Sequence, residues 1–229
     1  MVRRRRGAAR ADLPVAAPDV GAGTRPDRGA AAPMTATRPQ IVATGRLVQL
    51  REKLIEDLAQ DYEWRRDPEL AAYDAALPIT MSLHAFIATV ADDLEAPSSL
   101  RRNFAILDRA DGRHIGNVMY YGYDPTLREV ELGITIGLRE YWALGFGRDA
   151  VRTLLGYLFR ELGLRRVYLH TLTWNHRAQA SFARAGFRRV REVHRRGYDF
   201  VLMEMLADEF EAQDRERAGD EGRGAPPGR

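Results

Sequence analysis

The residues best placed for chemistry lie between positions 128 and 150, where a predicted strand is followed by a glycine turn and a helix. Gly145 and Gly147 flank Phe146 at the start of that helix. Glycines let backbone N–H groups approach an anion closely, and the first turn of a helix adds unpaired donors and a favourable dipole. The segment therefore predicts a site for a phosphate-bearing cofactor.

The strand before this turn carries carboxylates. Its apolar side chains are Val130, Leu132, Ile134 and Ile136, and they alternate with Glu129, Glu131, Gly133 and Thr135. Successive side chains of a strand point to opposite faces, so one face is predicted to enter the core and the other to carry the glutamates. A glutamate beside a bound cofactor is a candidate general base.

The elements that must position these residues follow from periodicity and turn signals. Strands are predicted at 42–50, 103–107, 113–121, 129–136, 166–172, 187–193 and 198–206. Helices are predicted at 52–64, 82–95, 146–162 and 175–185, with Asp67-Pro68 as a break in the helical pattern. This order predicts an α/β fold with a mixed sheet in one domain.

Composition narrows the class of protein. The chain has 229 residues, 45% of them apolar, which suits one core, and no cysteine, which excludes disulfides and thiolate chemistry. The net charge of only +3 is weak support for nucleic-acid binding, and no apolar run approaches the ~18 residues of a membrane span. No histidine pair has metal-ligand spacing with a carboxylate, so no metal is expected. We expect a cytoplasmic protein with neither nucleic acid nor membrane as a partner.

The two ends differ from the middle in composition. Residues 1–40 are rich in Arg, Ala, Pro and Gly, and residues 211–229 are highly charged. Such segments bury too little apolar surface to offset their ordering entropy, so both are predicted to be disordered tails around a domain at 41–210.

Taken together, the motifs of residues 45–210 resemble the GNAT acetyl-CoA-dependent N-acetyltransferases. The branch that looks most similar contains the ribosomal-protein N-terminal acetyltransferases. The matching pieces read, in order, GRLVQLRE, EWRRDPEL, YWALGFGRDA, NHRAQASFARAGF and RGYDFVLMEM. The resemblance implies a single domain with a mixed, mostly antiparallel central sheet, flanking helices and splayed strands at 129–136 and 166–172.

The resemblance also implies how acetyl-CoA is bound as a co-substrate. The pantetheine arm would follow the backbone of Ile134, Thr135 and Ile136, and Asn175 and Phe182 would line its path. The pyrophosphate would lie over a run of backbone amides. That run is Trp142, Ala143, Leu144, Gly145, Phe146, Gly147 and Arg148. Leu144 stands where many relatives have a basic residue.

Direct attack of the amine on the thioester in a ternary complex requires a base, which the resemblance places at Glu131. His170 is the rival, since its imidazole can act as a base through water. Phe182 replaces the tyrosine that protonates the leaving thiolate in many relatives, and Ser181 is a candidate substitute. The other four histidines, His84, His114, His176 and His194, are expected at the surface or in turns.

The acceptor is expected to be a primary amine, either a small molecule or a protein N-terminus. Trp64, Tyr73 and Tyr121 are candidate acceptor-binding residues, and segments 63–74, 121–124 and 194–198 are expected to shape the pocket. The alternative function is an acyl-CoA-binding sensor without catalysis, motivated by Phe182 and Leu144. A monomer or a homodimer is compatible with either function.

Overall fold

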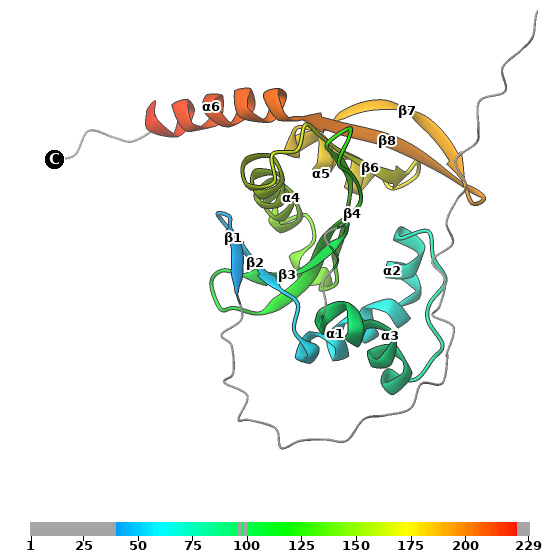
Figure 1. Cartoon of the computed structure of the whole chain (residues 1–229). Helices are drawn as coiled ribbons and strands as arrows, with labels where there is room; N and C mark the ends of the chain where they lie inside the picture. Colours follow the sequence, from blue (N-terminus) through cyan, green and yellow to red (C-terminus); the bar gives the residue numbers. More distant parts are fainter. Residues whose placement is uncertain (1–39, 96–97, 99, 224–229) are drawn as a thin grey trace, which may run out of the picture. The chain divides into compact units, whose positions relative to one another are not determined.

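An eight-stranded sheet forms the centre of the computed structural model, which describes residues 40–95, 98 and 100–223 (Figure 1). The strands are β1 Ile41–Thr44, β2 Val48–Glu52, β3 Arg102–Asp108, β4 His114–Asp124, β5 Glu129–Ile136, β6 Arg166–Leu172, β7 Arg188–Arg195 and β8 Tyr198–Leu206. Their order in the sheet is β1-β2-β3-β4-β5-β6-β8-β7. Among the strands that the structure describes, only the β5–β6 pair is parallel, so the predicted mixed, mostly antiparallel sheet is confirmed.

Helices cover both faces of this sheet. They are α1 Leu58–Arg66, α2 Pro68–Tyr73, α3 Leu83–Glu95, α4 Phe146–Gly156, α5 His176–Ala185 and α6 Ala207–Arg223, with short 3-10 turns at Ile55–Asp57 and Arg139–Tyr141 and a π turn at Tyr157–Glu161 that continues α4. Figure 1 shows α1, α2 and α3 gathered on the opposite side of the central strands from α4. Among the described residues, no helix combines the length and apolar character that a membrane span requires.

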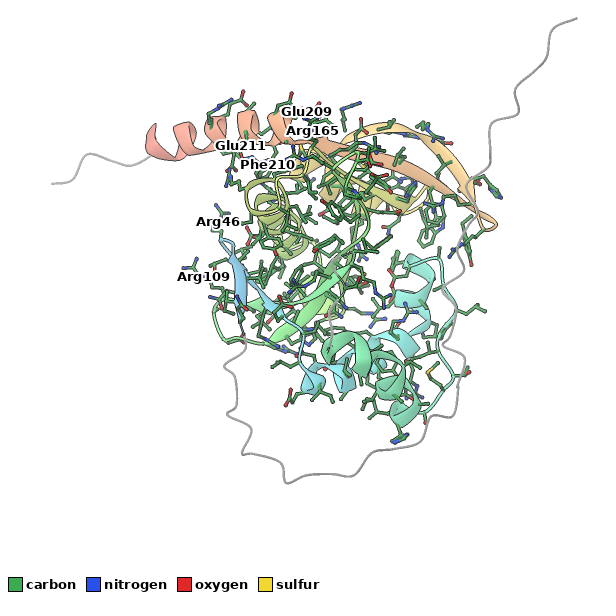
Figure 2. All side chains as sticks on the ribbon, viewed as in Figure 1. Arg46, Arg109, Arg165, Glu209, Phe210 and Glu211 are labelled. Carbon is green, nitrogen blue, oxygen red and sulfur yellow. The ribbon has the colours of Figure 1, made fainter. Side chains whose placement is uncertain are left out.

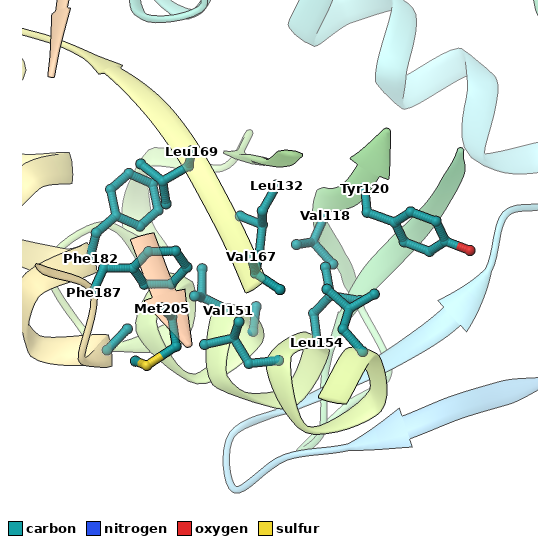
Figure 3. Close-up of a cluster of buried hydrophobic side chains, with 14 of the residues drawn as sticks. Val118, Tyr120, Leu132, Val151, Leu154, Val167, Leu169, Phe182, Phe187 and Met205 are labelled. Carbon is teal, nitrogen blue, oxygen red and sulfur yellow. The ribbon is translucent and has the colours of Figure 1, made fainter. Parts of the chain in front are cut away.

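Strand alternation separates a packed face from a polar face. Val118, Leu132 and Val167 pack with Val151 and Leu154 of α4 in the main core (Figure 3). The neighbouring residues of β4 and β5 must therefore face α1 and α2. The polar face is where the predicted carboxylate of β5 lies.

Strands β5 and β6 are paired over a short stretch and then diverge, as the resemblance implies for residues 129–136 and 166–172. Their register joins Glu129 to Arg166, Val130 to Val167 and Glu131 to Tyr168, and the pairing then ends. Beyond that point β5 stays paired with β4 as far as Ile136, while β6 stays paired with β8 as far as Leu172. We call the diverging halves of β5 and β6 the fork, and Glu131 occupies its vertex.

Several boundaries differ from the predicted ones. The predicted strand 42–50 is two strands, because Gly45 turns the chain and its N–H bonds to the Val48 carbonyl at 2.8 Å. The helix expected from position 52 begins at Leu58. Pro68 begins a helix instead of only ending one, because Asp67 caps the backbone N–H groups of the next turn and proline is tolerated at the first helical position.

Residues 211–223, for which the sequence predicts disorder, belong to α6. Phe210, labelled in Figure 2, lies near its start and is only 2% exposed. The guanidinium groups of Arg152 and Arg160 lie 4.9 and 5.2 Å from its ring centre. Asp214 then accepts hydrogen bonds from the same two arginines at 2.6 and 2.5 Å. One aromatic anchor and these ion pairs hold the helix that composition alone does not reveal. The predicted tail 1–40, apart from Gln40, lies outside the described residues.

Candidate active site

Glu131 lies at the vertex of the fork, on the polar face of β5. Its strand neighbours Val130 and Leu132 are 0% and 2% exposed in the core, so alternation directs Glu131 the other way. Cross-strand register places Tyr121 of β4 and Tyr168 of β6 on either side of it. Burial of the hydroxyl end raises the pKa of Tyr121, and the Glu131 carboxylate beside it adds to the rise.

Glu131 and His170 form one hydrogen-bonded pair. Nδ1 of His170 lies 2.7 Å from Oε1 of Glu131, and the two side chains are only 13% and 12% exposed. The sequence treats these residues as rivals, whereas the structure brings them together. A carboxylate at Nδ1 assigns the proton of a neutral imidazole to that nitrogen and leaves the lone pair on Nε2.

Arg195 of β7 lies against this pair. Its Nη1 is 3.1 Å from Nδ1 and 3.4 Å from Nε2 of His170, and 3.8 Å from Oε2 of Glu131. Similar distances to both ring nitrogens place the guanidinium over the face of the imidazole, an arrangement that arginine commonly adopts on planar rings. The Glu131–His170 pair therefore lies beside a positive charge.

The predicted glycine turn begins α4. Gly145 is the residue before the helix and has φ 95°, which glycine adopts without strain, and no side chain caps the helix there. The first N–H groups of α4 have no partner within the helix and point along its axis. The residues of the expected anion site therefore suit a diphosphate, and Leu144 beside them is 62% exposed.

The end of β5 directs alternate backbone groups into the fork. The Gly137 N–H bonds to the Ile115 carbonyl of the β4 side at 2.9 Å. Because alternate residues of a strand direct their N–H and C=O groups to opposite neighbours, Thr135 also faces β4, whereas Ile134 and Ile136 face the fork. Of these three predicted cofactor contacts, Ile134 and Ile136 direct their backbone N–H and C=O groups into the fork. The backbone groups of Thr135 are directed to β4.

Helix α5 provides the predicted residues of the β6 side. Asn175 is 8% exposed and caps α5 by accepting the Ala178 N–H at 3.1 Å. Phe182 is 8% exposed and packs in the core with Phe187, their ring centres 6.1 Å apart. Ser181 is half-buried, and in the described part of the chain it has no hydrogen bond to Glu131 or His170.

An aromatic cluster joins the far ends of β5 and β6. The Tyr73 ring of α2 lies 5.9 Å from Trp142 after β5 and 5.3 Å from Trp174 after β6. The guanidinium of Arg177 lies 3.6 Å from the Trp142 ring centre and 4.8 Å from that of Tyr73. Tyr73, predicted to contact the acceptor, thus lies at the mouth of the fork.

Trp64 and His114 do not lie where the sequence predicts. Trp64 is 6% exposed, and its indole packs so closely on Gly137 that a Cβ there would collide with it. It supports the end of β5 instead of offering a surface to an acceptor. His114 packs edge-on against Trp64 at 4.8 Å, and its side chain is only 12% exposed, so it is not a surface histidine.

Four residues near the fork were not singled out by sequence reasoning, namely Asp74, Trp174, Arg177 and Arg195. Asp74 lies 3.4 Å from the Thr135 hydroxyl and 3.8 Å from Arg65, and burial raises its pKa. The sequence indicated segments 63–74 and 194–198 as acceptor-facing, which contain Asp74 and Arg195. The sequence does not show which residue of each segment reaches the fork. The contact between the end of α2 and β5 identifies Asp74, and the turn after β7 identifies Arg195.

Known proteins with the same architecture include amine acetyltransferases. The spermidine N-acetyltransferase of Vibrio cholerae, in complex with CoA and spermine, superposes with a TM-score of 0.64 at 22% identity, covering 72% of this chain and 98% of that one. A GNAT-family acetyltransferase from Bacillus anthracis superposes with a TM-score of 0.61 at 16% identity, covering 72% and 98%. At these identities the likeness establishes the fold.

Sequence comparison is more specific. The uncharacterized N-acetyltransferase p20 of Bacillus licheniformis is 29% identical over 119 residues, which are 52% of this chain and 66% of that protein. The chain thus spans just under two thirds of that relative's length. Residues 46–188 match the family described as acetyltransferase (GNAT) domain, which is more than half of the chain. With this match, the uncapped glycine turn and the fork between β5 and β6, the chain belongs to the GNAT family of N-acetyltransferases.

Proposed function

We propose that this protein transfers the acetyl group of acetyl-CoA to a primary amine by direct attack in a ternary complex. The observation that carries the proposal is the Glu131–His170 pair at the vertex of the fork. Acetyl-CoA supplies an activated thioester, and the uncapped start of α4 supplies donors for its diphosphate. The chain itself must then bring the amine to the fork and take its proton.

In this proposal His170 and Glu131 act together as the base. Nδ1 of His170 donates its proton to Oε1 of Glu131 across 2.7 Å, so Nε2 is the atom that accepts the proton of the incoming ammonium. Glu131 also stabilises the imidazolium that results, in the way a carboxylate supports a catalytic histidine elsewhere. Glu131 and His170, which the sequence offered as alternative bases, thus act together, with His170 as the proton acceptor and Glu131 as its support.

The remaining steps use the backbone and the intrinsic chemistry of the thiol. The Ile136 N–H faces the fork and is the donor we assign to the carbonyl oxygen on which negative charge develops. A thiol pKa of about 8.5 makes the thiolate an adequate leaving group, so it can depart without an acid and take a proton from water, although Phe182 has none to give. We assign Ser181 no part in this step.

Two finer points belong to the proposal. The motifs resemble the ribosomal-protein N-terminal acetyltransferase branch, while several similar structures are named as spermidine acetyltransferases, so the acceptor is proposed as a primary amine of either origin. All the residues of the proposed site lie within one chain, so the proposed reaction is compatible with a monomer or a homodimer. A cytoplasmic location is part of the same proposal.

The test is release of free CoA thiol with a panel of peptides, amino acids and polyamines. We expect Glu131→Gln and His170→Ala each to lower kcat/KM by about 10²–10⁴-fold, because general base catalysis contributes that much. The double variant should be little worse than either single variant, because the two residues act as a unit. His176→Ala, an exposed histidine on α5, is the matched control.

The alternative function, an acyl-CoA sensor, is favoured by the buried Phe182 ring and the exposed Leu144. It predicts tight CoA binding by calorimetry with no thiol release from any acceptor in the panel. It also predicts that Glu131→Gln leaves CoA affinity unchanged. Release that depends on Glu131 would exclude the sensor.

A further inference from the structure

Arg195 is placed in the site by the turn that joins β7 to β8. Register pairs Arg195 directly with Tyr198, which leaves Arg196 and Gly197 as a two-residue loop. Both loop residues have positive φ, 51° and 81°, as in the tight turns that fit the twist of a hairpin. The turn therefore fixes the strand position from which the Arg195 side chain reaches His170.

The Arg195 guanidinium is only partly used by the protein. Its Nη1 contacts His170 at 3.1 Å and Glu131 at 3.8 Å, yet the side chain is 47% exposed. Glu131 is already hydrogen-bonded to His170 at 2.7 Å. An arginine with five N–H donors therefore retains donors directed to solvent at the position where an acceptor must approach.

Charges around the acceptor side of the fork favour a negative group. The Asp74 carboxylate forms an ion pair with Arg65 at 3.8 Å and accepts a hydrogen bond from the Thr135 hydroxyl at 3.4 Å. Arg177 lies on the Trp142 ring, and no carboxylate pairs with it among the residues that the structure describes. The acidic residues of the β7–β8 hairpin are paired as well: Asp199 with His194 at 2.7 Å, Glu192 with Arg189, and Glu204 with Arg166 and Arg188. Each of these carboxylates is therefore engaged, while Arg177 and the exposed part of the Arg195 guanidinium remain available.

We propose that Arg195 selects acceptor amines that carry a carboxylate or a similar anionic group within a few bonds of the reacting nitrogen. This inference rests on the proposed function and names its substrate class. An anionic group forms a charge-assisted hydrogen bond with the exposed guanidinium, and arginine can bind a carboxylate through two N–H groups at once. A second ammonium at the same place meets like charge. The site therefore differs from one built for a polycation such as spermine.

The test uses three acceptors of equal chain length that differ only in the charge of the far end, namely 4-aminobutyrate, butylamine and 1,4-diaminobutane. Each is titrated calorimetrically into the protein saturated with CoA, and each is assayed for thiol release with acetyl-CoA. The variants are Arg195→Lys, Arg195→Gln and Arg195→Glu. Arg191→Glu, an exposed arginine on the same strand, is the matched control, and circular dichroism verifies folding.

The wild-type protein and Arg191→Glu should bind 4-aminobutyrate about tenfold more tightly than 1,4-diaminobutane, with butylamine between them. Arg195→Lys should keep that order, Arg195→Gln should abolish it and Arg195→Glu should reverse it. Equal affinity for the three amines, preference for the diamine, or an order unchanged in Arg195→Glu would overturn the proposal. Because binding is measured apart from turnover, loss of thiol release with the order retained would count against the enzyme and not against Arg195.

Discussion

At the scale of single residues, Trp142 connects the fork to the cofactor turn. Its Nε1–H donates to the Ile136 carbonyl at 2.8 Å, and its ring carries the Arg177 guanidinium at 3.6 Å. The indole thus fixes the last fork-facing carbonyl of β5 to the turn that begins α4. Trp142, which the resemblance implies as a backbone contact of the pyrophosphate, thus also has a structural role for its side chain.

Replacing Trp142 with phenylalanine removes this hydrogen bond and keeps an aromatic ring. A neutral hydrogen bond contributes about 0.5–1.5 kcal/mol, so we expect the KM for acetyl-CoA to rise about 2–10-fold while kcat stays within about twofold. Steady-state thiol-release kinetics measure both values. Trp174→Phe is the control, because Trp174 is 50% exposed, and an equal effect of both substitutions would contradict the role of the Trp142 indole.

At the scale of elements, α4 is tied to the first hairpin by one carboxylate. Oδ2 of Asp149, in the first turn of α4, accepts the backbone N–H groups of Leu47 and Val48 at 2.7 and 3.1 Å. Gly45 leaves room for this contact, because a Cβ there would collide with the side chains of Asp149 and Thr153. The carboxylate also suits the positive end of the helix dipole. The start of α4, where the diphosphate is proposed to bind, is held in place from the β1–β2 turn.

Asp149→Ala should lower the free energy of unfolding by about 1–3 kcal/mol, because two backbone N–H groups lose a charged acceptor. Asp149→Asn retains an acceptor oxygen and should cost less. Urea denaturation at neutral pH measures both. Glu140→Ala breaks an exposed ion pair with Arg113 and should change stability far less, and equal losses in the two alanine variants would argue against the tether.

At the scale of the whole molecule, a buried polar cluster joins the sheet to α1. Nζ of Lys53 lies 2.6 Å from Asp61 and 2.8 Å from Asn117, and the Asn117 amide donates to Asp61 at 2.7 Å. His114 adds a contact of 2.9 Å from Nε2 to the Gly116 carbonyl. Burial lowers the pKa of His114, and the Lys53 charge lowers it further. Burial likewise lowers the pKa of Lys53, which its two aspartates oppose.

This cluster predicts how stability depends on pH. The pKa of His114 lies below its unfolded value of about 6.5, so the unfolded chain binds the proton more readily. The free energy of unfolding should therefore be greatest above about pH 6.5 and fall as the pH is lowered from there. Urea titrations between pH 8 and about pH 5.5 should show a shallower fall for His114→Gln. The exposed His176→Gln should behave as the wild type, and a fall that His114→Gln does not reduce would refute the assignment.

The sequence by itself determined which face of each strand a residue occupies and where backbone groups are free. The alternation along β5 placed Leu132 in the core and Glu131 on the polar face, and the glycines before α4 marked its uncapped start. The helical spacing of α4 and the turn residues of the β7–β8 hairpin were equally local signals. Each depends on neighbours within a few positions, which a single sequence displays directly.

Only the tertiary structure decided which of these residues meet. Glu131 and His170 are 39 positions apart and Arg195 another 25 beyond His170, and they come together because β6 lies between β5 and β8. His114 is buried because Trp64 and α1 cover it, and α6 forms because Phe210 and Asp214 meet the two arginines of α4 and its π turn. Periodicity assigns a face to each element but does not say which elements are neighbours, since that depends on packing between segments distant in the chain.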